Sequence, residues 1–214
     1  EVRRLLIGNG SEKDQRFELF VYGEMALNEH EADTGHPAYH NLFVECGWDG
    51  RALILHRREG APNSRPLCLA AALQGATEAV SVQTQRVRAL GRGNPLSRAD
   101  FLREPWPVQP VSLPLDPVLC MKTAVTVPAG QRAQISLVLS AADTRAEALS
   151  QLAWAQAIHN WNEVIELSCC QARAMERYLG VTTAQMRFIH RFLAVLERPL
   201  PMTEQQRAAV LQNR

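Results

Sequence analysis

The chain has 214 residues, of which 46% are hydrophobic, so it can bury one substantial core and is too apolar to be disordered. Its 23 basic and 22 acidic residues give a formal net charge of +1, and the basic residues are scattered along the chain. This pattern argues against the basic stripe with which proteins bind duplex nucleic acid.

The apolar runs and the N-terminal residues argue against a membrane segment. No apolar run approaches the ~20 residues that a membrane-spanning helix needs, and residues 1–10 lack the layout of a signal peptide. We therefore expect a soluble chain without membrane insertion, and its start at Glu1 rather than Met suggests a fragment or a processed protein. Five cysteines without a C-x-x-C pair indicate neither a disulfide framework nor a zinc site, so no metal or cofactor is expected.

The first two thirds of the chain are rich in strand-like runs separated by turn residues. These runs cover residues 17–27, 41–48, 51–58, 67–73, 79–87, 118–127 and 132–141. Residues 36–58 predict a β-hairpin around the turn GWDG at 47–50, and the PAG turn at 128–130 predicts a second hairpin. Strands without long helices between them predict an antiparallel sandwich.

A long connection spans residues 92–116 and contains five prolines and Trp106. Loops longer than about a dozen residues without structure of their own are usually functional or disordered. A tryptophan in the middle of this segment favours a packed, functional loop.

From Thr144 onwards the pattern is helical. Thr144 and Glu147 have the spacing of a capping box, and two later segments carry apolar stripes at helical spacing. The stripes contain Trp154, Ile158, Trp161 and Ile165, and then Met186, Ile189, Phe192, Leu193 and Leu196. They must pack on each other, on the sandwich or on another domain, and we expect Trp154 and Trp161 between helices. The chain is therefore divided into a β-sandwich at residues 1–142 and a helical linker at 143–214.

The sequence contains no self-sufficient catalytic motif. A nucleophile elbow, a P-loop and a G-x-G-x-x-G loop are all absent. His36 and His40 have the spacing of two metal ligands on a helix, but Pro37 and the following strand argue against a helix there. The carboxylates between residues 29 and 33 fit a solvated loop better than a glycosidase pair.

Two tryptophans are the candidates for a binding surface. Trp48 lies in the predicted hairpin turn and Trp106 in the long connection. An exposed indole offers a sugar ring a flat stacking surface, whereas a buried indole only packs, and packing is the commoner role of Trp. Both interpretations stay open at this point.

Several short motifs resemble one family, in the order in which that family has them. Residues 36–45, HPAYHNLFVE, are similar to the HPAFSNLFVET segment of cyclic β-1,2-glucan synthases, and Arg57-Arg58 to the RRP that follows it. Further matches in order are residues 90–93 with FLGRG, residues 115–118 with LDPI and residues 125–130 with RVPPG. The helical part resembles the family's linker helices, and the resemblance runs from about residue 32 to the C-terminus.

The resemblance implies a fold and a setting. This region of the synthases resembles the sandwich of cellobiose and chitobiose phosphorylases, which implies a mainly β, antiparallel supersandwich of the galactose mutarotase-like type, followed by an α-helical linker towards an (α/α)₆ barrel. The catalytic acid and the phosphate pocket would belong to that barrel, outside this chain. The parent would be a membrane protein at the cytoplasmic face of the bacterial inner membrane, a glycosyltransferase that uses nucleotide-activated glucose.

The implied function is a non-catalytic segment that holds or orients a β-glucan and docks neighbouring catalytic domains. The candidate carbohydrate-binding residues are Trp48, Trp106 and Arg92, and no catalytic residue is expected. One alternative is that Arg92 and the loop around Trp106 complete the active site of an adjacent domain. Another is a structural spacer without sugar affinity, in which both indoles would be buried.

Overall fold

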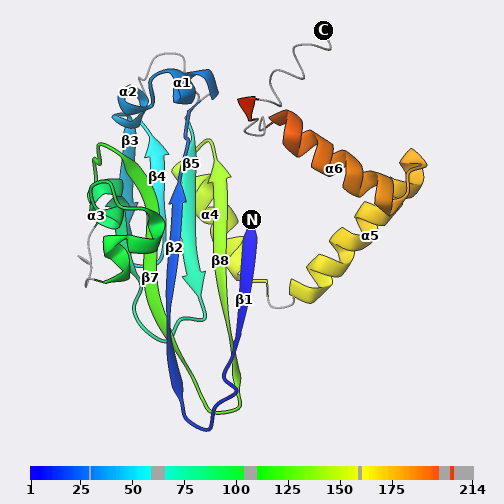
Figure 1. Cartoon of the computed structure of the whole chain (residues 1–214), viewed down its shortest axis with the longest axis horizontal. Helices are drawn as coiled ribbons and strands as arrows, with labels where there is room; N and C mark the ends of the chain where they lie inside the picture. The colour runs from blue at the N-terminus through cyan, green and yellow to red at the C-terminus, as the bar shows by residue number, and fades with distance from the viewer. Residues whose placement is uncertain (29, 59–65, 104–109, 159–160, 198–202, 205–214) are drawn as a thin grey trace. The chain divides into compact units, whose positions relative to one another are not determined.

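The computed structural model describes residues 1–28, 30–58, 66–103, 110–158, 161–197 and 203–204 (Figure 1). Its contacts divide the chain into two units, Glu1–Ile158 and His159–Arg214. The first unit contains β1 (Val2–Gly8), β2 (Gln15–Glu24), α1 (His30–Gly35), α2 (Pro37–Asn41), β3 (Val44–Trp48), β4 (Leu53–Arg57), β5 (Cys68–Gln74), β6 (Ser81–Gln85), α3 (Arg86–Leu90), the 3₁₀ turns η1 (Leu96–Arg98) and η2 (Asp100–Leu102), β7 (Pro117–Val127), β8 (Arg132–Ala142) and α4 (Arg145–Gln156). The second contains α5 (Trp161–Leu179) and α6 (Thr183–Glu197).

The strands form two antiparallel sheets. The larger sheet has the order β1-β8-β5-β4-β3 and the smaller one the order β2-β7-β6. The predicted hairpin at residues 36–58 is present as β3 and β4, in which Glu45 lies opposite His56 and Trp48 opposite Leu53. The prediction of a mainly β, antiparallel sandwich followed by helices is confirmed.

The first two strands and the last two strands each cross from one sheet to the other. β1 and β2 lie in different sheets, as do β7 and β8, so β1 pairs with β8 and β2 pairs with β7. The predicted hairpin around residues 128–130 is therefore wrong, because a turn between two strand-like runs does not determine which strands pair. The Asn9 side chain joins the two crossings, since its Nδ2 donates to the carbonyl oxygens of Lys13 and Val127, both at 2.8 Å.

Several elements differ from the sequence prediction. Helix α1 contains Glu31 and Asp33, for which a solvated loop was expected. Strand β1 lies outside the runs predicted as strands. Its arginines and leucines come in adjacent pairs, so its sequence has no alternation of polar and apolar residues that would indicate a strand. The run expected to continue as a strand to Val87 ends at Gln85, and α3 begins there, with Ala89 and Leu90 buried. Helix α2 forms contrary to expectation, because a proline at the first helical position lacks only an N–H that has no partner in the helix.

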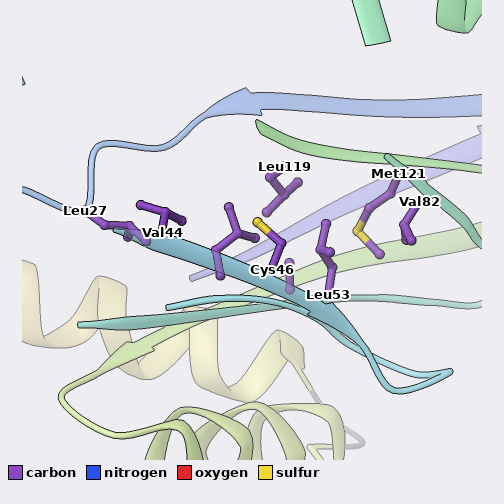
Figure 2. Close-up of a cluster of buried hydrophobic side chains, with 9 residues drawn as sticks. Leu27, Val44, Cys46, Leu53, Val82, Leu119 and Met121 are labelled. Atoms are coloured by element: carbon purple, nitrogen blue, oxygen red, sulfur yellow. The ribbon is translucent and has the colours of Figure 1, made fainter. Parts of the chain in front are cut away.

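The core between the sheets is built from the inward side chains of both (Figure 2). Val44, Cys46 and Leu53 come from the larger sheet, and Leu119 and Met121 come from the smaller one. All five are almost completely buried, with at most 6% of their surface exposed. Such burial contributes on the order of 1.5–3 kcal/mol for each large aliphatic side chain, so this layer contributes strongly to stability.

A helix covers part of each outer face of the sandwich (Figure 1). On the larger sheet, Ala148 and Leu152 of α4 pack on Ala70, Ala72 and Val138. Alanines in β5 leave room for the helix to approach the sheet closely. On the smaller sheet, α3 and η2 cover the outer side of β7.

Helix α4 begins as predicted and belongs to the first unit. The Thr144 side chain accepts a hydrogen bond from the Glu147 N–H at 3.2 Å, the cap that the sequence indicated. The Trp154 side chain is 69% exposed, and its expected position between helices stays a prediction. Any separate helical unit begins after Ile158, and the assignment of residues 143–214 to a linker remains a prediction.

The second unit has a helical corner defined by local hydrogen bonds. Helix α5 ends at Leu179 and is followed by Gly180, whose φ of 65° suits a residue without a side chain. The Thr182 and Gln185 side chains cap each other's backbone N–H groups at 3.3 and 2.8 Å, and α6 begins there. Both helices keep apolar side chains exposed, among them Leu167, Met175, Tyr178, Phe188 and Phe192.

Candidate functional site

The three predicted carbohydrate-binding residues lie in separate parts of the chain. Trp48 ends strand β3, is half-buried, and packs against the core between the sheets. Arg92 is exposed in the turn after α3, the helix that covers the smaller sheet. Trp106 lies outside the described residues. Trp48 and Arg92 thus belong to different layers, and sugar binding by any of the three stays a prediction.

The motif residues 36–58 contact each other around a buried arginine. Arg57 is 3% exposed, and its Nη2 lies 3.3 Å from Nδ1 of His40 in helix α2. Its guanidinium carbon lies 5.9 Å from the centre of the Phe43 ring. Burial lowers the pKa of Arg57, and its Nε has no hydrogen-bond partner among the described residues. These contacts give the motif a structural role in holding α2 on the end of the sandwich.

Two adjoining pockets lie on the outer face of β3 and β4 beside the start of α4. The first, of about 270 Å³, is lined by Glu45, Cys46, Gly47, Ile54, His56, Ser112, Leu113 and Arg145. The second, of about 260 Å³, is lined by His56, Arg57, Pro66, Leu67, Cys68, Asp143, Thr144 and Arg145. We call the two pockets together the outer groove. His56 and Arg145 line both, so they form the boundary between its two halves.

The alternation of the hairpin strands builds the floor of the outer groove. Val44 and Cys46 of β3 face the core, so Glu45 and Gly47 face outwards. Helix α4 packs over β5 and β8 and leaves the outer side of β3 open. The segment around Ser112 forms the opposite wall, where the Ser112 carbonyl accepts a hydrogen bond from the Cys46 N–H at 2.8 Å.

A small network of charges lies on the floor. The Nε2 atom of His56 lies 3.4 Å from Oε2 of Glu45, and Nε of Arg58 lies 3.4 Å from the other carboxylate oxygen. Arg58 also donates from Nη2 to the Leu42 carbonyl at 2.6 Å. These side chains are 35–42% exposed, so water screens the Glu45–Arg58 ion pair and weakens the Glu45–His56 contact, and each contributes little to stability. The side chains of Glu45 and His56 line the first pocket, within reach of a ligand.

Arg145 stands at the wall shared by both pockets, in the first position of α4. The N-terminus of a helix carries a partial positive charge, so a cation there is electrostatically unfavourable. Among the described residues, Arg145 makes no hydrogen bond or ion pair that would offset this cost. Its guanidinium donors are therefore available to a ligand in either pocket.

Sequence reasoning did not identify Glu45, His56 and Arg145 as site residues. Period-two alternation within the hairpin could have placed Glu45 and His56 on one face, because they lie directly opposite each other. No local pattern could have brought Arg145 to them, since that contact depends on how α4 crosses the sheet.

The described residues also bear on metal, membrane and thiol chemistry. None of the described helices is long and apolar enough to cross a membrane. Within the same residues, no three His, Cys, Asp or Glu side chains gather where they could hold a metal ion. Cys46, Cys68 and Cys120 are buried, Cys169 and Cys170 are exposed, and all five are free thiols.

Comparison with known proteins connects the chain to a carbohydrate-related family. The chain is 23% identical over 191 residues to the cyclic beta-(1,2)-glucan synthase NdvB of Rhizobium meliloti (strain 1021). That alignment covers 86% of this chain and 7% of the relative, so the chain spans a small part of that protein's length. The model of the glycosyl hydrolase 94 supersandwich domain matches residues 1–157, nearly the whole first unit. The chain therefore belongs to the glycosyl hydrolase 94 supersandwich domain family.

Proposed function

We propose that this chain is a non-catalytic carbohydrate-binding and scaffolding segment of a larger glucan synthase. It holds or orients a β-glucan and docks the neighbouring catalytic domains of its parent. The observation that carries the proposal is the family match over residues 1–157, supported by the similarity to a protein named as a cyclic glucan synthase. The parent would be a membrane protein and a glycosyltransferase at the cytoplasmic face, and the segment alone would be inactive.

The docking role is supported by the helices of the second unit. Leu167 of α5 and Phe188 of α6 are 75% and 69% exposed, and further apolar residues follow each of them at helical spacing. A large apolar surface of this kind indicates a contact with another protein surface. We assign that contact to the catalytic domains of the parent.

A second candidate function concerns the catalytic domain that the segment would dock. Arg92 is exposed on the turn after α3 and makes no ion pair within the described residues, so it is free to reach a neighbouring active site. In the full-length parent, Arg92→Ala would then abolish turnover while glucan binding stays intact. Equal losses of both would instead assign Arg92 to glucan holding.

Calorimetric titration of the purified chain tests the binding proposal. Linear and cyclic β-1,2-glucans are titrated into the chain, and cello-oligosaccharides serve as the linkage control. Saturable heat with β-1,2-glucans alone is the expected result. No heat with any glucan would overturn the binding role and leave a structural spacer.

A further inference from the structure

The open floor of the outer groove is the first indication that it accepts a ligand. Gly47 lies on this floor, and a Cβ atom added there would meet nothing within 4 Å. At about 270 and 260 Å³, each pocket lies just below the range of about 300–1,000 Å³ that is typical of sites for drug-sized ligands. Each half therefore suits one small ring rather than a long chain.

The chemistry of the lining fits a neutral sugar. A hexose presents hydroxyl groups that both donate and accept hydrogen bonds, together with apolar C–H faces. The first pocket offers the Glu45 carboxylate as an acceptor and the Arg145 guanidinium as a donor, with Ser112 able to act as both. Ile54 and Leu113 add an apolar surface to the same pocket. Asp143 and Thr144 provide oxygen atoms in the second pocket.

The side chain of Arg145 is a second indication that the outer groove accepts a ligand. A cation at the positive end of a helix is unfavourable, and no partner among the described residues compensates it. The side chain instead stands between two pockets, where a bound ligand would accept its hydrogen bonds.

We propose that the outer groove is a glucan subsite in which two consecutive hexose residues occupy the two pockets, on either side of His56 and Arg145. This inference rests on the proposed glucan binding and assigns it to residues different from Trp48, Trp106 and Arg92. The glucan lies over Gly47, accepts hydrogen bonds from Arg145, and donates to Glu45. The contact between Glu45 and His56 opens at small cost because both side chains are partly exposed.

Filling the groove with a side chain tests the proposal in the whole chain. Gly47→Leu places an isobutyl group on the floor, and Gly10→Leu is the matched control, since Gly10 lies in the β1–β2 crossing and also has open space around its Cβ position. Linear β-1,2-gluco-oligosaccharides are titrated calorimetrically into both variants. We expect Gly47→Leu to weaken binding by about tenfold or more and Gly10→Leu to leave Kd unchanged.

A second pair of variants keeps the test valid if Gly47→Leu does not fold. Arg145→Gln removes the exposed cation at the shared wall, and Arg132→Gln removes an exposed arginine at the start of β8. We expect several-fold weaker binding for Arg145→Gln alone. Circular dichroism of each variant verifies that the fold is retained.

The outcomes separate this inference from the proposed function. If the wild-type chain binds glucan and neither Gly47→Leu nor Arg145→Gln weakens it, the groove assignment is overturned while the binding function stands. If the wild-type chain binds no glucan, both are overturned. A titration with inorganic phosphate completes the test, because phosphate binding that requires Arg145 without glucan binding would make the groove an anion site and overturn the proposal.

Discussion

Glu45 and His56 lie directly opposite each other in the β3–β4 hairpin, with 3.4 Å between the carboxylate Oε2 and the imidazole Nε2. Both side chains line the first pocket of the outer groove, where strand register, and not the fold of a loop, brings the two groups together. Because both side chains are partly exposed, the pair is suited to exchange partners with a ligand rather than to stabilise the hairpin.

A double-mutant cycle measures how weak this pair is. We expect Glu45→Ala, His56→Ala and the double variant to give a coupling energy of about 0.2–1 kcal/mol in urea unfolding at neutral pH, because water weakens a contact between partly exposed side chains. A coupling of more than about 2 kcal/mol would show that the pair is structural, and that a ligand could not displace it at small cost.

Gly75 should be the most sensitive glycine of the sandwich. Its φ is 85°, and a Cβ atom there would collide with the backbone carbonyl of Gln134. Gly130 has a similar φ of 69° but open space, which makes it the matched control. Each alanine substitution carries the left-handed conformational cost of about 1–2 kcal/mol, and Gly75→Ala adds the clash. Equal losses of unfolding free energy for the two variants would contradict the collision.

The packing of α4 on the larger sheet predicts where the chain can be divided. Leu152→Ala removes a side chain that is 3% exposed, so we expect it to lower the free energy of unfolding by about 2–5 kcal/mol. Trp154→Ala on the same helix serves as the control, because that side chain is 69% exposed and its loss should cost little.

A fragment of residues 1–158 should fold, whereas one that ends at residue 142 should be destabilised. Cooperative thermal unfolding of both fragments verifies this.

The buried thiol of Cys46 predicts an alkaline loss of stability. Burial, with a smaller contribution from Glu45, raises the pKa of Cys46 to about 12. In the unfolded chain the thiol ionises near its usual pKa of about 8.5. The folded state thus holds the proton more tightly, so the stabilisation is complete below about pH 8.5 and is lost as the pH rises towards 12.

The measurement compares the wild-type chain with Cys46→Ala by urea unfolding between pH 8 and about 11. Wild-type stability should fall by about 1.4 kcal/mol per pH unit more steeply than that of the variant. Parallel profiles would mean that the thiol is not protected from solvent. Cys169→Ala, which changes an exposed thiol, should leave the slope as in the wild type.

Local patterns in the sequence predicted elements better than their partners. The strand-like runs at residues 41–48 and 51–58 and the turn at residues 47–50 identified the hairpin, and Thr144 with Glu147 identified the start of α4. The turn at residues 128–130 was equally clear, yet β7 and β8 lie in different sheets. Pairing is decided by packing over the whole core, which a short window of sequence does not contain.

For the candidate site, too, the sequence indicated local features but not the long-range arrangement. The tryptophans were noticed because aromatic residues in turns are visible in sequence, but Trp48 packs against the core. The outer groove depends on Arg145 meeting a hairpin about a hundred residues earlier in the chain, a contact that only the crossing of α4 creates. No spacing rule could have indicated it.

The crossing of β1 and β2 between the sheets also has a consequence for the order of folding. The backbone nitrogen of Glu1 donates to the carbonyl of Leu139 at 2.8 Å, a contact that spans 138 residues of the chain. During synthesis, β1 and β2 are made before the other strands that the structure describes, yet their partners β8 and β7 are made last among them. The hairpin of β3 and β4 can form early, whereas the N-terminal strands must wait unpaired, so the sandwich closes only when its two ends meet.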